Sequence, residues 1–474
     1  MLKNYLTKLL TKGCLLTAFF LTACEQTEPP QPIRYAPTGP VSAEQQRPGD
    51  PEAGYRALVN NAYISCGPPY TAYSQTASVP RPDQLLPDRT GRNKELPYFL
   101  NAITSVDGVE LVSSNCLYCH AGYFDGKLII GLGNEFLDFT DDRTSRSERL
   151  GQYVKTEAEA QQWRKWADRI ATIAPYITTD TLGINPAVNA TLVLMAHHDR
   201  ETLAWSEKPL MQPPPQKPLP VSVPPWWRMN KKHAMFYNAE GRGDHARIMM
   251  LASILCTDSV AEARTVDQWA PDIRAYLESL EAPDYPYPIN DQLAKQGARV
   301  FQQNCSACHG SYDKDDYYPN LLIAYEEVGT DPELAKKAVG KEGERYIRWF
   351  NQSYFGEIAR AEPAPGYIAP PLDGVWATAP YLHNGSVPTI EALLNSPTRP
   401  RYWLYPEAPT DYDQQTLGWH ITKMDYGKSG AKNPEELKRI YDTTLEGYSN
   451  TGHIYGDHLN AADRAAVIEY LKTL

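Results

Sequence analysis

Residues 293–310 read LAKQGARVFQQNCSACHG and contain Cys305, Cys308 and His309 in the order C-x-x-C-H. This order is the signature of c-type haem attachment. The spacing has a chemical reason, because two thiols three residues apart each add to one vinyl group of a single porphyrin. The adjacent imidazole then stands under the iron. The stretch therefore predicts a covalently bound haem with His309 as its proximal iron ligand.

A second copy of the motif lies upstream, where residues 116–120 read CLYCH and end in His120. A single copy also arises by chance, or in a zinc or thiol redox site. Two copies in one chain favour haem more strongly, above all if the chain is exported. The sequence therefore predicts two covalently bound haem c groups, with Cys116, Cys119 and His120 holding the first iron porphyrin.

Residues 1–24 have the composition of a secretory signal, with lysines at the start, a short apolar stretch and the ending LTAC. The ending resembles the lipobox of bacterial lipoproteins, which predicts lipidation of Cys24. Glu25 follows rather than Asp, so the lipid anchor is expected in the outer membrane, facing the periplasm or the cell surface. Plain cleavage and release is the alternative. Export suits the haem prediction, because bacteria attach haem c outside the inner membrane.

The chain has 474 residues, enough for two or three domains, and a net charge of −11. The acidic balance argues against nucleic acid as a partner. It suits a basic redox protein, although a solvated surface has the same composition. Cys66 and Cys256 remain after the signal, lipid and haem cysteines are assigned, so a disulfide between them is possible in an oxidising compartment. Nothing predicts the oligomeric state.

Composition divides the chain into four parts. Residues 1–24 are the signal, and residues 25–50, rich in Pro, Gln and Glu, are expected to form a disordered tether. Residues 51–284 and 285–474 each contain one haem motif. The predicted fold is mainly α, with two cytochrome c-like haem domains, long irregular insertions and few short β-hairpins.

Hydrophobic periodicity and turn residues predict individual elements. In the first half these are a hairpin within 121–140, a helix over 156–174, a proline-rich loop over 211–225 and a helix over 270–280. In the second half, a helix before the motif and a final helix over 461–474 are expected to pack together. Phe301 and Tyr470 are the candidate contacts between these two helices.

Two segments carry a family resemblance. Residues 369–394, APPLDGVWATAPYLHNGSVPTIEALL, are similar to a segment of bacterial di-haem cytochrome c peroxidases. Residues 441–456, YDTTLEGYSNTGHIYG, resemble an element near the C-terminus of the rubber oxygenase branch of that superfamily. The resemblance implies an oxidoreductase whose first haem binds peroxide or dioxygen and whose second haem relays electrons.

The resemblance also implies roles for two histidines near the second haem. His453 corresponds to the distal ligand in the rubber oxygenase branch, and His383 corresponds to a residue that hydrogen-bonds near the haem. Each could instead be an ordinary hydrogen-bonded histidine. The remaining candidates for the distal ligand are His420, His458 and Met424.

The first haem differs, because no histidine occurs between His120 and His197. Phe136 and the neighbouring Phe139 suggest an apolar distal pocket, and therefore an iron open to peroxide or dioxygen. A second axial histidine is the alternative, and its candidates are His197, His198, His233 and His245.

Trp226 and Trp227 resemble the region in which the family keeps a tryptophan between its haems, although tryptophan more often packs in a core. The neighbouring cations Arg228, Lys231, Lys232 and Arg242 could neutralise haem propionates, or simply form a solvated loop.

Three classes of function follow. The first is an oxidoreductase that acts on a small oxidant. The second is a non-catalytic di-haem electron-transfer cytochrome of the cell envelope that exchanges electrons with a redox partner protein. The third is a lipoprotein with structural or sensory haems. The size of the insertions favours the enzyme.

Overall fold

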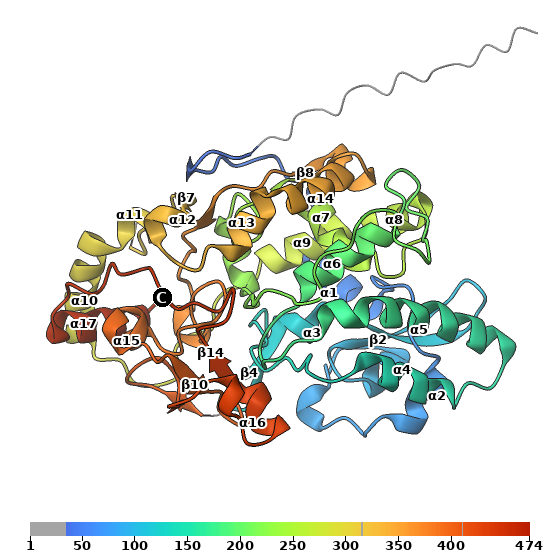
Figure 1. Cartoon of the computed structure of the whole chain (residues 1–474), viewed down its shortest axis with the longest axis horizontal. Coiled ribbons are helices and arrows are strands. Elements are labelled where there is room, and N and C mark those ends of the chain that lie inside the picture. The colour runs from blue at the N-terminus through green and yellow to red at the C-terminus, as the bar shows by residue number, and fades with distance from the viewer. Residues whose placement is uncertain (1–34, 314–315, 410) are drawn as a thin grey trace, which may run out of the picture. The chain divides into compact units, whose positions relative to one another are not determined.

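The computed structural model describes residues 35–313, 316–409 and 411–474 (Figure 1). The predicted signal, Cys24 and the first part of the predicted tether lie outside these residues. Short helices dominate the described chain, and its strands form sheets of two or three strands only. The mainly helical class and the short hairpins agree with the sequence prediction.

The first half contains nine α-helices among its described residues: α1 Pro51–Asn60, α2 Tyr70–Thr76, α3 Leu117–His120, α4 Arg143–Gly151, α5 Glu157–Ile177, α6 Ala187–His197, α7 His245–Met249, α8 Val260–Asp267 and α9 Ala270–Glu278. Its hairpins are β2 Leu100–Thr104 with β3 Glu110–Ser114, and β4 Ala121–Phe124 with β5 Lys127–Ile130. The predicted hairpin and both predicted helices are present, and the proline-rich loop contains no helix. Residues Trp226–Lys231 form a 3-10 helix, η3.

The described residues of the second half form α10 Asp291–Asn304, α11 Ser306–His309, α12 Tyr325–Val328, α13 Glu333–Val339, α14 Lys341–Asn351, α15 Ile390–Leu393, α16 Pro434–Arg439 and α17 Ala461–Leu471. Two antiparallel sheets have the strand orders β1–β7–β9 (Gly39–Pro40, Leu321–Ala324, Gly366–Ile368) and β13–β10–β14 (Thr422–Lys423, Tyr402–Leu404, Ile440–Asp442). Two further pairs are β11 Tyr412–Asp413 with β12 Gly418–Trp419, and β6 Gly241–Gly243 with β8 Ala359–Ala361.

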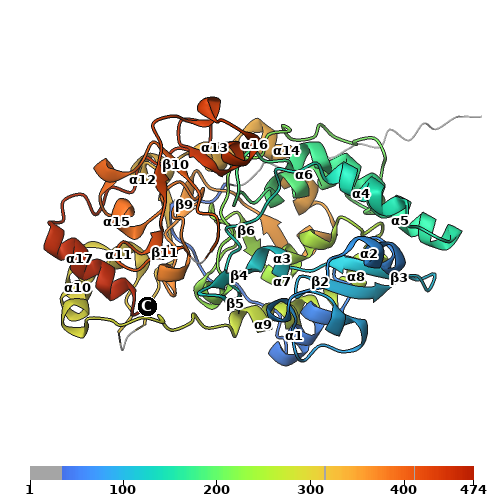
Figure 2. The same cartoon turned by 90° about the horizontal axis from the view of Figure 1, so that it is seen from below.

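Helices α10 and α17 pack side by side, as the sequence predicted (Figures 1 and 2). Gly297 permits the close approach, because a Cβ atom there would lie 1.8 Å from the carbonyl oxygen of Ala466. The rings of Phe301 and Tyr470 contact each other at 5.2 Å between centroids. The side chain of Asn290 accepts a hydrogen bond from the backbone N–H of Leu293 and so caps α10, which ends at the second haem motif.

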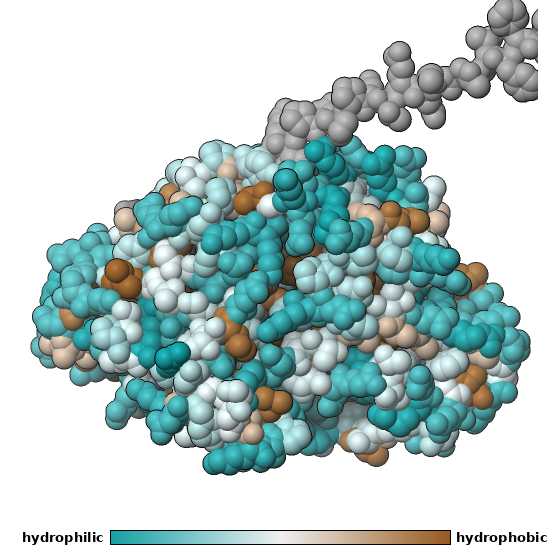
Figure 3. All heavy atoms as spheres, in the orientation of Figure 1, coloured by the Kyte–Doolittle hydropathy of each residue, from teal (hydrophilic) through white to brown (hydrophobic). Residues whose placement is uncertain are grey.

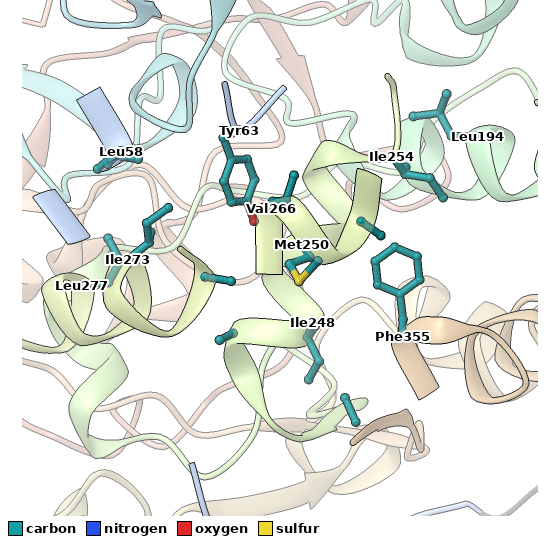
Figure 4. Close-up of a cluster of buried hydrophobic side chains, with 14 of the residues drawn as sticks. Leu58, Tyr63, Leu194, Ile248, Met250, Ile254, Val266, Ile273, Leu277 and Phe355 are labelled. Atoms are coloured by element: carbon teal, nitrogen blue, oxygen red, sulfur yellow. The ribbon is translucent and has the colours of Figure 1, made fainter. Parts of the chain in front are cut away.

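The two halves share a core, so the predicted boundary at residue 284 does not divide two separately packed bodies. The described residues from Tyr35 to Leu474 fall within one compact unit. Phe355, from the second half, is fully buried among Met250, Ile254 and other residues of the first half (Figure 4). Helix α14 adds Trp349, whose indole N–H donates to the backbone carbonyl of His198 at 2.9 Å.

Residues 35–50 are not a disordered tether, contrary to the prediction for residues 25–50. Strand β1 pairs with β7, and the Arg47 guanidinium lies 2.9 Å from the Asp244 carboxylate and 2.8 Å from that of Asp267. Glu44 forms an ion pair with Arg360 at 2.7 Å. Composition misled the prediction, because backbone pairing and ion pairs order this segment without a hydrophobic pattern. We call residues 35–50 the N-terminal strap.

A disulfide joins Cys66 to Cys256, with their Cα atoms 5.5 Å apart. The pairing that the sequence left open is therefore present, and it links the loop after α1 to the segment before α8. The four motif cysteines form no disulfide.

The helices of the described chain were compared with the length and composition that a membrane-spanning helix needs. None of its helices combines the length and the apolar composition that crossing a bilayer requires. On the face drawn in Figure 3, hydrophobic residues are scattered among polar ones rather than gathered in one broad patch.

Candidate haem-binding sites

The second motif lies at the end of α10, where the chain turns at Cys305 into the short helix α11. The Nδ1 atom of His309 donates a hydrogen bond to the carbonyl oxygen of Pro370 at 2.8 Å. Because a carbonyl only accepts, this contact places the proton on Nδ1 and leaves Nε2 free to bind a metal. Burial lowers the pKa of His309 and favours the neutral form that ligates iron.

His453 faces His309, with 6.1 Å between the ring centroids. Two imidazoles on opposite sides of one metal, each bonded at about 2 Å, have ring centres about 6 Å apart. The separation therefore fits one iron between them. Burial, followed by the neighbouring His309 and Arg399, lowers the pKa of His453 to about 3. Its backbone φ of +45° is uncommon for a residue with a side chain and marks a held conformation.

Arg399 holds this conformation. Its Nη1 donates to the carbonyls of Asn450 and Gly452 at 2.6 and 2.7 Å, and its Nη2 donates to the carbonyl of His453 at 3.1 Å. The backbone N–H of His453 donates to the carbonyl of Val328 at 2.7 Å. One guanidinium thus supplies donors to three carbonyls of the loop and fixes the backbone from which the imidazole projects.

We expect Arg399→Ala to release the loop while leaving both haems attached. The three carbonyls lose their donors, each hydrogen bond to a charged group being worth about 1.5–3 kcal/mol. The measurable result is partial loss of the distal ligand, seen as high-spin signal in the absorption and electron paramagnetic resonance spectra. Arg401→Ala is the matched control, because the Arg401 side chain is exposed and lies over Tyr402. Wild-type spectra for Arg399→Ala would contradict this role.

One cavity contains both motif cysteines, His309 and His453, and most of its wall is apolar. Its walls also include His383, whose ring stacks on Tyr367 at 4.2 Å. Burial lowers the pKa of His383 to about 3, so this imidazole is neutral. The donor set, the apolar walls and the paired imidazoles fit a haem.

Two of the four predicted cations line this cavity. Arg228 is buried and donates to the Asp373 carbonyl at 2.9 Å, rather than to a carboxylate, and Lys232 lies near it. Both cations are suited to haem propionates. Lys231 instead pairs with carboxylates at 2.8 and 3.0 Å, and Arg242 lies 3.6 Å from that of Glu44. The solvated-loop alternative therefore fits these last two better.

A buried arginine, Arg89, supports the chain segment that leads into the first motif. The Arg89 guanidinium donates to several backbone carbonyls and, at 2.8 Å, to the Asn101 side-chain oxygen. That oxygen also accepts from Asn115, whose own side-chain oxygen accepts from the backbone N–H of Leu117 at 2.9 Å. This chain of contacts sets the turn that carries Cys116.

His120 stacks on Trp226, with ring centroids 4.6 Å apart and planes 17° apart. Burial lowers the pKa of His120 to about 4, while the nearby Pro224 carbonyl acts in the opposite direction. The Nδ1 atom is shielded from solvent and makes no hydrogen bond of normal geometry. Trp227, the other tryptophan singled out in the sequence, donates its indole N–H to the Asp373 carbonyl at 2.8 Å.

Among the described residues, no second histidine ring contacts His120. His198 has both ring nitrogens at carbonyl oxygens, 2.8 and 3.0 Å away, and so has no free ligating atom. His197 and His233 each use Nδ1 on a carbonyl. His245 retains a buried Nε2 without a hydrogen bond, so it stays a candidate together with His197 and His233.

The other predicted site residues lie apart from these contacts. Phe136 packs edge-on against Trp419 at 5.2 Å and Tyr405 at 6.4 Å, both from the second half. Phe139 lies against Tyr118 of the first motif at 6.1 Å. For the second haem, the side chains of His420 and His458 are exposed, and neither lines the cavity. Cys24 lies outside the described residues.

Within the part of the chain that the structure describes, no group of three or more His, Cys, Asp and Glu side chains is arranged to hold a metal ion. Sequence reasoning missed the groups that orient the ligands, namely Arg89, Pro370 and Arg399. No local pattern marks them, because their contacts join a side chain to a backbone carbonyl at another point of the chain, 61 residues away for Pro370 and 51 for Arg399 and Asn450.

Comparisons with known proteins agree with the site. A family model described as "Cytochrome c" matches residues 294–382, and one described as "RoxA-like, cytochrome c-like" matches residues 366–404. These matches relate the chain to the cytochrome c family. Cytochrome c domains bind haem c covalently, so the matched segments support haem c binding.

Curated relatives occur in Sinorhizobium fredii (strain NBRC 101917 / NGR234). "Uncharacterized protein y4iM" is 30% identical over 235 residues, covering 42% of this chain and 52% of the relative. "Uncharacterized protein y4iJ" is 32% identical over 248 residues, covering 39% of each chain. The chain thus spans about half or less of the length of these relatives, and their names carry no function.

Proposed function

We propose that the chain is an exported, lipid-anchored di-haem c-type oxidoreductase. In this proposal the first haem binds peroxide or dioxygen, and the second relays electrons from a redox partner protein. The observation that carries the proposal is an asymmetry between the two sites. His309 faces a second imidazole at 6.1 Å, whereas His120 stacks on an indole and contacts no second histidine ring among the described residues.

The protein's own residues account for this division of roles. A haem with two strong axial ligands exchanges electrons, whereas a haem with an open face also binds small oxidants. At the second site, Pro370 orients His309, and Arg399 holds the loop of His453 in place. Arg228 and Lys232 supply positive charge for the propionates. At the first site, Trp226 fixes the plane of the His120 imidazole by stacking.

A continuous path connects the two sites. Trp226 stacks on His120, Trp227 follows it in the chain, and the Trp227 indole donates to Asp373. Asp373 lies three residues after Pro370, the acceptor of the His309 hydrogen bond. This sequence of ring contacts, covalent bonds and hydrogen bonds is suited to electron transfer between the two proximal ligands.

The test is a comparison of reactions on the purified holoprotein. We expect two haems per chain, carbon monoxide binding to one of them after reduction, and consumption of hydrogen peroxide with a reduced cytochrome as donor. Oxygen uptake with polyisoprene as substrate would identify the oxygenase chemistry instead. Two haems that are both low-spin and bind no carbon monoxide would overturn the proposal.

The second candidate is a non-catalytic electron-transfer cytochrome. The unpaired Nε2 of His245 favours it, because a histidine at the first iron would close that site. His245→Ala distinguishes the two functions: it would open a closed first haem, and it would leave an already open one unchanged.

A further inference from the structure

Glu135 is a buried carboxyl group in the wall of the second haem's cavity. Its Oε1 accepts a hydrogen bond from the backbone N–H of Val223 at 3.2 Å, while its Oε2 has neither solvent contact nor a hydrogen-bond partner. A buried carboxylate oxygen without a partner is costly, whereas a protonated carboxyl is tolerated. The environment of Glu135 therefore favours the protonated form.

The position of Glu135 joins the two haem sites. The preceding residue, Asn134, donates its backbone N–H to the carbonyl of Cys119 at 2.8 Å. Val223, whose N–H donates to Glu135, follows Ser222 in the chain. The backbone N–H of Ser222 donates to the carbonyl of His383 at 2.9 Å. Glu135 is thus tied to the first motif through its chain neighbour and to the second cavity through its side chain.

Charged and titratable groups face this carboxyl from several elements. Arg228 and Lys232 line the same cavity, as do Tyr237 and His383. Tyr405 and Tyr441 approach from the β10–β14 sheet, and burial raises the pKa of both phenols well above its usual value. Burial likewise raises the pKa of Glu135 well above that of an ordinary glutamate, against the smaller effect of the Val223 N–H. Among the described residues neither Arg228 nor Lys232 forms an ion pair with a carboxylate, so propionates are expected to balance their charge.

We propose that Glu135 is the redox-linked protonation site of the second haem. Its carboxylate binds a proton when an electron enters the haem and releases the proton when the electron leaves. The inference rests on the proposed function only in that the second haem carries electrons. Each electron adds one negative charge to the cavity and so strengthens proton binding at Glu135. By thermodynamic linkage, loss of that proton makes reduction harder. The midpoint potential of the second haem therefore falls as pH rises.

The test is a spectroelectrochemical titration of the holoprotein from the pH at which an ordinary glutamate titrates upward to alkaline pH, because burial raises the pKa of Glu135. The second haem is identified as the low-spin haem that binds no carbon monoxide. In the wild type, its reduction equilibrium is expected to shift by up to about tenfold per pH unit. Glu135→Gln removes the proton but keeps the shape, and should flatten the dependence while the other haem is unchanged.

Glu240→Gln is the matched control, because Glu240 is a second carboxyl whose pKa burial raises, yet it hydrogen-bonds Asn238 and does not line the cavity. A pH dependence unchanged in Glu135→Gln, or lost equally in Glu240→Gln, would overturn the inference. Redox-induced infrared difference spectra of the wild type give a second readout. They should contain the C=O band of a carboxylic acid, and its absence would also count against Glu135. These readouts need no peroxide turnover, so they separate this inference from the proposed activity.

Discussion

A His453→Ala variant is expected to keep both covalently bound haems while one of them changes from low-spin to high-spin. The reason is geometric, because His453 and His309 face each other at the separation of two ligands on one iron. Removing one imidazole opens that face. The number of haems that bind carbon monoxide after reduction should rise from one to two per chain, which absorption spectroscopy and haem quantification measure together.

His458→Ala is the control for this experiment. His458 lies five residues later on the same segment, but its Nε2 contacts the side-chain oxygen of Asn304 at 2.9 Å and its side chain is exposed. The His458→Ala variant should leave the absorption spectra of both haems unchanged. If His458→Ala opened the second haem and His453→Ala did not, the ligand assignment would be wrong.

Removing one pair of motif cysteines should remove one haem and one kind of reactivity. The double variant Cys116→Ser with Cys119→Ser is expected to lose half of the haem and all carbon monoxide binding, because only the two-histidine site remains. The reciprocal variant, Cys305→Ser with Cys308→Ser, should also contain one haem but keep carbon monoxide binding. Mass spectrometry of the intact chain and pyridine haemochrome spectra count the haems.

These reciprocal variants test both haem assignments at once. A wild-type chain with a single haem, or equal ligand binding by both variants, would contradict the asymmetry on which the proposed function depends. The shared core is a reason to measure folding as well, since haem loss in one half can loosen the other. Far-ultraviolet circular dichroism separates such unfolding from simple loss of a haem.

The elements with strong local signals were predictable from the sequence. Helix α10 has a capped start, an apolar stripe and the motif at its end, and its packing against α17 was predicted with Phe301 and Tyr470 as the contacts. The hairpin after the first motif followed from Asp125 and Gly126 at its turn. Such features depend on neighbours in the chain, which is why periodicity and turn chemistry revealed them.

The shared core and the ligand-orienting groups could not be predicted in the same way. Phe355 packs into the first half across about a hundred residues of chain, and Arg399 acts on carbonyls some fifty residues away. Neither contact leaves a local pattern. The N-terminal strap was misjudged for a related reason, because its proline-rich composition hides the ion pairs that Glu44 and Arg47 make with distant elements.

The order of the N-terminal strap changes how far the body could stand from a bilayer if Cys24 carries lipid. A free leash from Cys24 to residue 50 would reach about 90 Å when fully extended. With residues 35–50 docked, only the stretch up to Tyr35 is available, which reaches about 40 Å at most. If Cys24 carries lipid, the docked strap therefore moves the attachment point of the body from residue 50 to Tyr35 and cuts its greatest distance from the lipid by about half.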